Sequence, residues 1–394
     1  MHTSDHAARL DNVLPDVTEW RRELHRHPEL QYDLPRTSAF VAEKLRSFGC
    51  DEVVEGIGRS GVVALVHGRN RDSKRVVGLR ADMDALPITE ATGAEWASTD
   101  SGKMHACGHD GHTAMLLGAA RALADSRAFD GTVALIFQPA EEGGAGALAM
   151  IEDGLMDRFG IERVFGMHNM PGVPVGEFAT RPGPLMACAD QFDLVVEGRG
   201  GHAAMPHMCV DAMLVAAEIV IGLQSIASRN VRPVDPVVVT VTAMRVDGDA
   251  YNVIPDKVYL RGTVRAFDED VRLLAKRRVG EIAAGIAAAH GATTTLDYQD
   301  GYPATVNDIE ETAFVADVAR AVAGEGKVDT DKSPVMGAED FSYMLNERPG
   351  AFIFCGNGDT ASLHHPEYDF DDAALRHGCA YWVTLVESAL PLEA

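Results

Sequence analysis

Positive charge is scarce in this sequence, and its scarcity limits the classes of partner. The 394 residues include 35 lysines and arginines against 59 aspartates and glutamates, which gives a formal net charge of −24. Nucleic acids and anionic lipid surfaces both favour proteins with clustered cations. Neither a nucleic-acid nor a membrane partner is therefore expected. The acidic residues are spread along the chain, and we interpret them as a contribution to solubility.

Long apolar runs and paired cysteines are also missing. The most apolar stretch, residues 212–223, contains Glu218 and is too short to span a bilayer. The N-terminal residues lack the basic and apolar segments of a secretory signal. The six cysteines show no paired spacing, so no disulfide framework is expected and the reducing cytoplasm is the predicted location.

Two common hydrolase motifs do not occur. The sequence contains neither H-E-x-x-H nor G-x-S-x-G, which argues against a zincin and an α/β-hydrolase. Residues 144–149 fit the G-x-G-x-x-A pattern of a dinucleotide-binding turn. The adjacent Glu141 and Glu142 would repel a pyrophosphate, however, so a nucleotide site is not expected there.

Helix-like and strand-like segments alternate along the chain. Helices are expected at residues 14–26, 36–48, 111–125, 146–157, 208–228, 268–290 and 310–323, and strands at residues 61–68, 75–82, 163–170, 190–197, 236–246, 256–266, 292–300 and 351–357, with a further strand opening at residue 131. Up to about residue 170 this alternation is typical of a mainly parallel sheet covered on both faces. After about residue 185 the order becomes βαββαβ, which is the ferredoxin-like pattern.

The change of pattern predicts an α/β fold with an inserted second domain. The first domain, with a mostly parallel sheet, is expected from residues 1–185 and 301–394. The ferredoxin-like α+β domain is expected at residues 186–300.

One short segment is unusually rich in metal-ligating side chains. Residues 105–112 contain His105, Cys107, His109, Asp110 and His112. Thiolates, imidazoles and carboxylates are the usual ligands of zinc and of neighbouring transition metals. A single histidine here would more often be incidental to a helix cap, but the density of the cluster predicts a metal site.

Other polar residues follow expected strands. Glu141 and Glu142 come after an apolar run, and adjacent carboxylates repel each other unless a cation lies nearby. One of them can ligate a metal while the other takes a proton from water. Asp82 and His168 also close expected strands, and open α/β sheets bind their ligands at the carboxyl ends of strands. These four residues are therefore expected at one edge of the sheet.

Two later segments offer further histidines. His364 and His365 follow the expected strand at residues 351–357, and one of them can be a distal ligand, although their chemistry does not distinguish them. His202 follows Gly200 and Gly201, which suggests a flexible loop that presents an imidazole; an ordinary surface loop explains it equally well.

Six motifs, taken together, resemble those of the aminoacylase/carboxypeptidase superfamily of dinuclear metallohydrolases. They are GLRADMDALPI, MHACGHDGH, FQPAEEGGAGA, GMHNMP, GRGGHAAMPH and LHHPEYDF, and the resemblance runs from about residue 14 to 390. Within the superfamily the chain is similar to the branch of hippurate hydrolase, N-acyl-L-amino acid amidohydrolases and plant auxin-conjugate amidohydrolases. The resemblance implies a metal-dependent amidohydrolase that cleaves hippurate, N-acetyl or indole-acyl amino acids. It also implies that the inserted domain is a lid that pairs subunits into a dimer or tetramer.

The resemblance implies a role for each site residue. The metal ligands would be Cys107, His109, Glu142, His168 and His364, with Cys107 shared, His109 and Glu142 on one metal and His168 on the other. Glu141 matches the general base, which accepts a proton from the water activated by the metals. Asp82 matches a carboxylate that orients a ligand, and two divalent ions (zinc, manganese, cobalt or nickel) are the implied cofactors.

The resemblance extends to the expected lid domain, and the chain departs from the superfamily pattern at one position. His202 and Asn252 match residues that contact the substrate, and Arg265 matches a residue that assists them. Many superfamily members have a histidine ligand at the first strand end, where this chain has Arg80. Arginine stays protonated and cannot ligate a metal, so His109 is expected to replace that ligand.

Two other functions compete with this prediction. The first is a dipeptidase or carboxypeptidase on the same scaffold. The second is a metal-storing or ligand-binding protein without enzymatic activity. Glu141 argues against the second, because a pure binding site has no need of a base beside the ligand Glu142.

Overall fold

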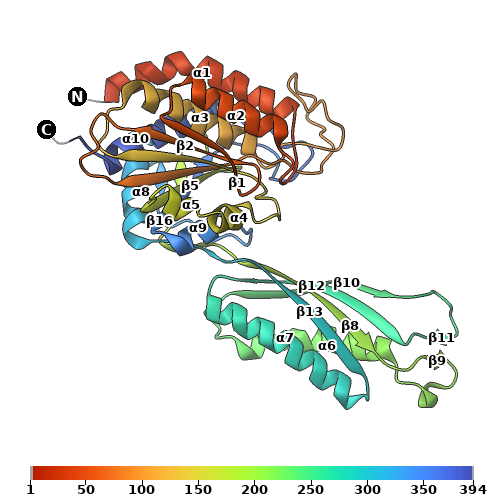
Figure 1. The fold of residues 1–394 in the computed structure, drawn as a ribbon. Helices are drawn as coiled ribbons and strands as arrows, with labels where there is room; N and C mark the ends of the chain where they lie inside the picture. Colours follow the sequence, from red (N-terminus) through yellow and green to blue (C-terminus); the bar gives the residue numbers. More distant parts are fainter. Residues whose placement is uncertain (1–2, 393–394) are drawn as a thin grey trace. The chain divides into compact units, whose positions relative to one another are not determined.

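The computed structural model describes residues 3–392 and divides them into two compact units (Figure 1). The first unit contains residues up to 185, residues 306–333 and residues 340 onward. The second contains residues 186–305 and 334–339. The second unit is therefore an insertion in the sequence of the first.

An eight-stranded sheet forms the centre of the first unit. Its strands lie in the order β1 (Glu52–Ile57), β2 (Gly61–His67), β4 (Thr132–Gln138), β3 (Val76–Asp82), β5 (Arg163–Met170), β16 (Gly350–Gly356), β6 (Phe178–Ala179) and β15 (Val328–Asp329). The four strands from β4 to β16 are parallel, whereas β1, β2 and β6 pair antiparallel with their neighbours β2, β4 and β16. The parallel strands therefore end at a common edge.

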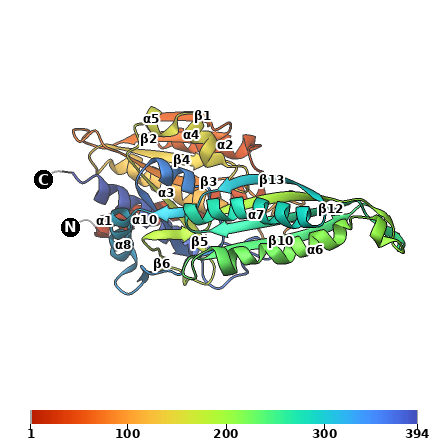
Figure 2. The same cartoon turned by 90° about the horizontal axis from the view of Figure 1, so that it is seen from below.

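Helices cover both faces of this sheet (Figure 1, Figure 2). One face carries α1 (Thr3–Arg26), α2 (Pro35–Ser47), α3 (His109–Ser126), α8 (Ile309–Ala323) and α10 (Ala373–Ala389). The other carries α4 (Gly146–Glu152), α5 (Leu155–Arg158) and α9 (Ser342–Glu347). Helix α3 is buried on nearly all sides, because it lies between the sheet and the helices α1 and α10.

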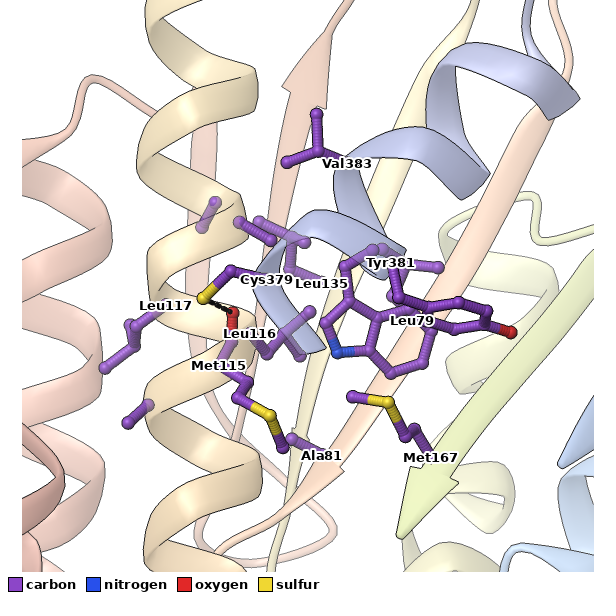
Figure 3. Packing of buried hydrophobic residues seen from close by; sticks show 14 of the residues in the cluster. Leu79, Ala81, Met115, Leu116, Leu117, Leu135, Met167, Cys379, Tyr381 and Val383 are labelled. Carbon is purple, nitrogen blue, oxygen red and sulfur yellow. Dashed lines mark hydrogen bonds between the residues drawn. The ribbon is translucent and has the colours of Figure 1, made fainter. Parts of the chain in front are cut away.

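Apolar side chains on alternate positions of the strands build the main core. Leu79 and Ala81 of β3 face α3, together with Leu135 of β4 and Met167 of β5 (Figure 3). Residues between them on β3 point to the opposite face of the sheet, as the strand period of two requires. This alternation places Arg80 on the face that α4 and α9 cover.

The second unit contains a four-stranded antiparallel sheet. Its strands lie in the order β10 (Val237–Val246), β12 (Lys257–Ala266), β8 (Ala189–Glu197) and β13 (Thr293–Tyr302). Helices α6 (Ala212–Leu223) and α7 (Glu269–Ala289) pack on it around a separate core. Its short strands β9 (Gly201–His202) and β11 (Val253–Ile254) pair with each other. Strands β7 (Gly183–Met186) and β14 (Thr305–Asn307) also pair, and most of their residues belong to the first unit. Two single turns, Pro206–Met208 and Ile226–Asn230, complete the second unit.

The expected fold class is confirmed: the large sheet is mostly parallel, and the inserted strands and helices follow the βαββαβ order. Several details differ from the sequence-based expectation, and the following three concern helices. Helix α1 starts at Thr3 and continues through Pro15, although proline removes one hydrogen bond. The helix expected at 146–157 breaks at Gly154, whose φ is 84°. The C-terminal helix α10 was not expected, although its buried face packs against α3.

No helix within residues 3–392 is both long enough and apolar enough to cross a bilayer.

Two helical glycines provide a test of the close packing around α3. A methyl group on Gly118 would lie 2.6 Å from Cys379 Sγ and 2.8 Å from Val17 Cγ2, whereas one on Gly285 of α7 would meet nothing within 4 Å. We expect Gly118→Ala to destabilise the first unit by about 1–3 kcal/mol through overpacking. Gly285→Ala should stabilise α7 by about 0.5–1 kcal/mol, because alanine favours helix more than glycine does.

Urea denaturation can follow the two effects separately. All three tryptophans, Trp20, Trp96 and Trp382, lie in the first unit, so their fluorescence reports its unfolding alone. Circular dichroism at helical wavelengths reports both units. Equal transitions for Gly118→Ala and the wild type would contradict the close contact between α3, α1 and α10.

Candidate metal centre

Six polar side chains of the first unit come together where its parallel strands end. Glu141 and Glu142 lie on the loop between β4 and α4, and His168 lies near the end of β5. Cys107 precedes α3, whose first residue is His109. The sixth, His364, comes from the segment between β16 and α10. The strand order thus brings distant parts of the sequence to one edge.

The ligand atoms of these residues form overlapping groups within 4.8 Å that could each hold a metal ion. The groups are Cys107, His109 and His168; Cys107, Glu142 and His364; and His109, Glu141 and Glu142. Cys107 Sγ lies 3.3 Å from His168 Nε2. Because Cys107 belongs to two of the groups, its sulfur is placed where two cations could share it.

The imidazole of His109 is held in one orientation. Its Nδ1 donates a hydrogen bond to the backbone oxygen of Asp84 over 2.8 Å. The opposite nitrogen, Nε2, lies 4.0 Å from oxygens of both Glu141 and Glu142. A hydrogen bond from one ring nitrogen leaves the other unprotonated when the ring is neutral, which is the state that ligates a metal.

Two buried polar atoms of the centre lack a hydrogen-bond partner within the described residues. Within the described residues, His109 Nε2 and Glu142 Oε1 are buried and make no hydrogen bond. Buried polar atoms are normally satisfied by a partner. Together with the nearby thiol and imidazoles, these atoms form a donor set of nitrogen, oxygen and sulfur that fits a divalent transition metal.

The charges around the centre also favour a bound cation. Burial alone would lower the pKa of His109, but Asp82, Asp84 and Glu142 raise it to about 10. Burial, followed by the charges of Glu142 and Glu141, raises the pKa of the Cys107 thiol well above its usual range. Both groups therefore stay protonated, because the surrounding carboxylates favour the more positive form of each. A bound cation would compensate the same negative charge and displace those protons.

The structure distinguishes the two adjacent histidines. His364 Nε2 lies 3.4 Å from Glu142 Oε1, whereas His365 turns away and its Nδ1 accepts a hydrogen bond from the backbone of Glu367 over 3.1 Å. The backbone of His364 has a φ of 66°, which is unusual for a residue other than glycine. Its amide donates to the oxygen of Ala106 over 2.8 Å, which ties this segment to the residue before Cys107.

Asp84, which the sequence analysis overlooked, organises the carboxylate loop. Its Oδ1 accepts from the amide of Glu141 over 2.9 Å and its Oδ2 from the amide of Glu142 over 3.1 Å. Asp84 lies two residues beyond Asp82 and outside β3, so it does not close a strand as Asp82 does. The repeated aspartate of the motif ADMD was the available signal. Tyr32 also supports the loop, because its hydroxyl donates to the oxygen of Gly144 over 2.6 Å.

Asp82 lies beside the donor set. Its Oδ1 pairs with His112 Nδ1 over 2.6 Å, and its Oδ2 lies 3.7 Å from His109 Nε2. Burial would raise the pKa of Asp82, but Arg80, His109 and His112 hold it well below its usual range. The other nitrogen of His112 accepts from the backbone amide of Asn169 over 2.8 Å. Asp82 and His112 thus connect β3 to the end of β5.

The remaining members of the histidine-rich segment face elsewhere. Asp110 accepts from His25 Nδ1 of α1 over 2.8 Å. His105 is completely buried, and burial lowers its pKa to about 3. Of the five ligand-type residues in this segment, only Cys107 and His109 belong to a group with His168, Glu142 or His364.

The three expected lid residues belong to the second unit. His202 is exposed on β9, and its Nδ1 accepts from the amide of Ala204 over 3.1 Å. Asn252 is exposed in the turn before β11. Arg265 is half-buried on β12 and donates to the oxygen of Val264 over 3.0 Å and to the Thr263 hydroxyl.

Comparisons with known proteins show which family and which relatives the chain resembles. Residues 78–388 match the model of peptidase family M20/M25/M40. The chain is 40% identical to a hippurate hydrolase of Campylobacter jejuni, over 95% of this chain and 98% of the relative. It is 41% identical to an N-acetyl-L-cysteine deacetylase of Bacillus subtilis, over 90% and 83% of the two chains. It is also 40% identical to thermostable carboxypeptidase 1 of Saccharolobus solfataricus, over 95% and 96%.

A solved structure shares the fold. The YxeP protein of Bacillus subtilis, described as a dinuclear metal-binding peptidase of the M20 family, is 34% identical and superposes with a TM-score of 0.84. The match covers 96% of this chain and 99% of that protein.

Cation binding should release protons, so the affinity should rise with pH. At neutral pH both His109, with a pKa of about 10, and the thiol of Cys107 hold protons that a ligated cation must displace. Calorimetric titration of the metal-free protein with Zn²⁺, in buffers of different ionisation enthalpy, measures the number released. Cys107→Ser should release about one proton fewer, because a serine hydroxyl stays protonated.

Cys50→Ser provides the matched control, since Cys50 lies in the same unit but in none of the ligand groups. It should leave the proton count unchanged. The same count for Cys107→Ser and the wild type would contradict ligation by the thiolate.

Proposed function

The chain belongs to peptidase family M20/M25/M40, and from this premise we propose that it is a metal-dependent amidohydrolase that cleaves N-acyl amino acids. The observation that carries the proposal is the convergence of Cys107, His109, Glu142, His168 and His364 beside Glu141. Relatives named as hippurate hydrolase and N-acetyl-L-cysteine deacetylase, both about 40% identical, support this substrate class. The acyl group can therefore be aromatic or small.

The proposed cofactors are two divalent metal ions. The similar YxeP protein is described as dinuclear, and two ligand groups of this chain share Cys107. The thiolate favours zinc, whereas carboxylates and imidazoles are also compatible with manganese, cobalt and nickel. Bound ions of this kind polarise an amide carbonyl and lower the pKa of water.

Glu141 is the proposed general base. Its carboxylate is buried and lies 4.0 Å from His109 Nε2, at the edge of the donor set. From this position it accepts a proton from the attacking water and delivers it to the leaving amine. The amide of Glu141 is held by Asp84, so the carboxylate approaches the substrate from a fixed backbone.

Asp82 and Asp84 are proposed to position the ligands. Asp84 holds the amides of Glu141 and Glu142, and its backbone oxygen orients His109. Asp82 holds His112, whose other nitrogen accepts from the residue after His168. Partners of this kind typically contribute about 10–100-fold to metal affinity or activity.

The second unit is proposed to serve as a lid and as a subunit contact. His202 and Asn252 would contact the acyl oxygen and the carboxylate of the substrate, with Arg265 in support; the exposure of the first two is compatible with this role. Helix α6 exposes Leu214 and Ile221, which supports pairing of two subunits into a dimer or tetramer. The described cysteines are all free, which is compatible with a cytoplasmic location.

A second candidate function is a carboxypeptidase or dipeptidase. The specific observation in its favour is the 40% identity to thermostable carboxypeptidase 1. A comparison of N-acyl amino acids with free dipeptides separates the two, because only the dipeptides carry a free amino group.

The proposal predicts that the wild type hydrolyses hippurate or N-acetyl amino acids with a higher kcat/KM than free dipeptides. Glu141→Gln should abolish this turnover, with a loss of at least about 10²–10⁴-fold, because the amide cannot accept the proton. Metal content, measured by elemental analysis, should stay close to that of the wild type. Full metal occupancy without hydrolysis of any acyl amino acid would instead favour a binding protein.

Glu152→Gln, a carboxylate change at the end of α4, serves as the control for Glu141→Gln. It should leave both metal content and turnover unchanged. A Glu141→Gln variant that retains turnover would contradict the role of Glu141 as the general base.

The adjacent histidines predict a second contrast. His364→Ala should reduce metal content and kcat/KM, since its Nε2 points to Glu142, with an expected loss of about 10-fold or more. His365→Ala should have little effect, because the side chain of His365 accepts a hydrogen bond from the backbone of Glu367 and belongs to none of the ligand groups. Elemental analysis and kinetics of the two variants, side by side, provide the measurement. Equal losses would show that the two histidines are not distinguished in solution.

A further inference from the structure

Arg80 cannot bind metal because it stays protonated, and yet it is among the most completely buried charges of the described residues. It lies on the central strand β3, and its side chain is 0% exposed. The side chain lies on the face of the sheet opposite α3, with its guanidinium carbon 5.8 Å from the ring centre of Phe341. A buried charge is expensive unless it is paired and hydrogen-bonded.

The guanidinium of Arg80 donates hydrogen bonds to at least three partners. Nη1 donates to Asp82 Oδ2 over 2.6 Å, Nη2 to Asp340 Oδ1 over 3.0 Å, and Nε to Gln138 Oε1 over 2.8 Å. Asp82 and Asp340 are themselves 0% exposed. One cation is thus shared by at least two buried carboxylates and one amide.

Asp340 extends this arrangement to both ends of the loop that carries Glu141 and Glu142. Its carboxylate accepts from Gln138 Nε2 over 2.7 and 2.9 Å, at the end of β4, and from the amide of Ala147 over 2.9 Å, in the first turn of α4. The loop between these two residues contains Ala140 and Ala145 with φ of 53° and 55°. Backbone in this region is costly for residues other than glycine, so it persists only where its surroundings hold it.

Asp82 extends the arrangement in the other direction. Its second oxygen holds His112 over 2.6 Å, and His112 Nε2 accepts from the amide of Asn169, the neighbour of His168. Arg80 is therefore connected to the carboxylate loop through Asp340. It is connected to the end of β5 through Asp82 and His112.

We propose that Arg80, together with Asp340, is a positioning residue that fixes the distance between the donor atoms of the Glu141–Glu142 loop and those of His168. This inference rests on the proposed function only in that it takes those donors to hold metal. The planar guanidinium suits the task, because it presents donors in three fixed directions. A lysine at this position would keep the charge but could not hold all three partners in the same geometry.

The test compares Arg80→Lys and Arg80→Met with the wild type. The first measurement is Co²⁺ affinity, by competition with a chelator, together with the visible absorption of the cobalt-loaded protein. Both variants should bind Co²⁺ about 10–100-fold more weakly, and the absorption bands should change, since they depend on the ligand geometry. The second measurement is kinetics, where kcat should fall more than KM changes, because Arg80 lies outside the second unit with its proposed substrate contacts.

Arg163→Met is the matched control. Arg163 lies at the start of β5, at the opposite end of the strand from His168, and pairs with Glu311 over 2.7 Å from Nε. Its loss removes an arginine–carboxylate pair from the same sheet without touching the donor set. Cobalt affinity, absorption, kcat and KM should match the wild type.

Arg80→Met leaves two buried carboxylates without their cation and can prevent folding. In that case Arg80→Lys and Asp340→Asn carry the test, and both should show the weaker cobalt affinity. Wild-type affinity and absorption in a folded Arg80→Lys protein would overturn the proposal. A wild type that binds Co²⁺ but hydrolyses no amide would instead overturn the proposed function, while the cobalt comparison would still test Arg80.

Discussion

Concentrated negative charge at the carboxyl edge of the parallel sheet is the constraint around which the first unit is organised. Asp82, Asp84, Glu141 and Glu142 all lie there, largely removed from water. Carboxylates in such a place repel each other strongly unless cations compensate them. Arg80 compensates part of this negative charge through its ion pair with Asp82. The raised pKa of His109 reflects the negative charge that is left uncompensated. The donor set is therefore a site whose own residues favour a further positive charge.

The order of the strands explains why these residues meet. β3, β4, β5 and β16 are neighbours and parallel, so the segments that follow them reach the same edge although they are far apart in sequence. Helix α3 contributes in a different way, because it is buried against the sheet and begins at His109. Its packing against α1 and α10 fixes the position from which Cys107 and His109 project. The precision of the centre thus depends on the apolar core behind it.

Sequence patterns predicted most of the elements and the candidate donors, because both depend on local features. The period of apolar residues predicts β3 and β5 within a residue, and the density of ligand types singles out residues 105–112. The partner of each side chain is a matter of tertiary geometry, however. Nothing local shows that Asp110 turns to His25 while Cys107 turns to His168. The importance of Asp84 beside Asp82 likewise depends on a loop that is more than fifty residues away in sequence, at Glu141.

Arg80 illustrates how a residue that cannot itself ligate a metal can support the residues that do. A neutral histidine at this position would leave Asp82 and Asp340 without the cation that they share in the interior of the protein. Removal of one member of a buried ion pair typically costs several kcal/mol, whereas well-matched replacement of the whole group can be neutral. Loss of the charge at Arg80 is therefore expected to cost less when its carboxylate partners change with it. Because those partners also hold the carboxylate loop and the end of β5, the choice of arginine here constrains the donor set on both sides of it.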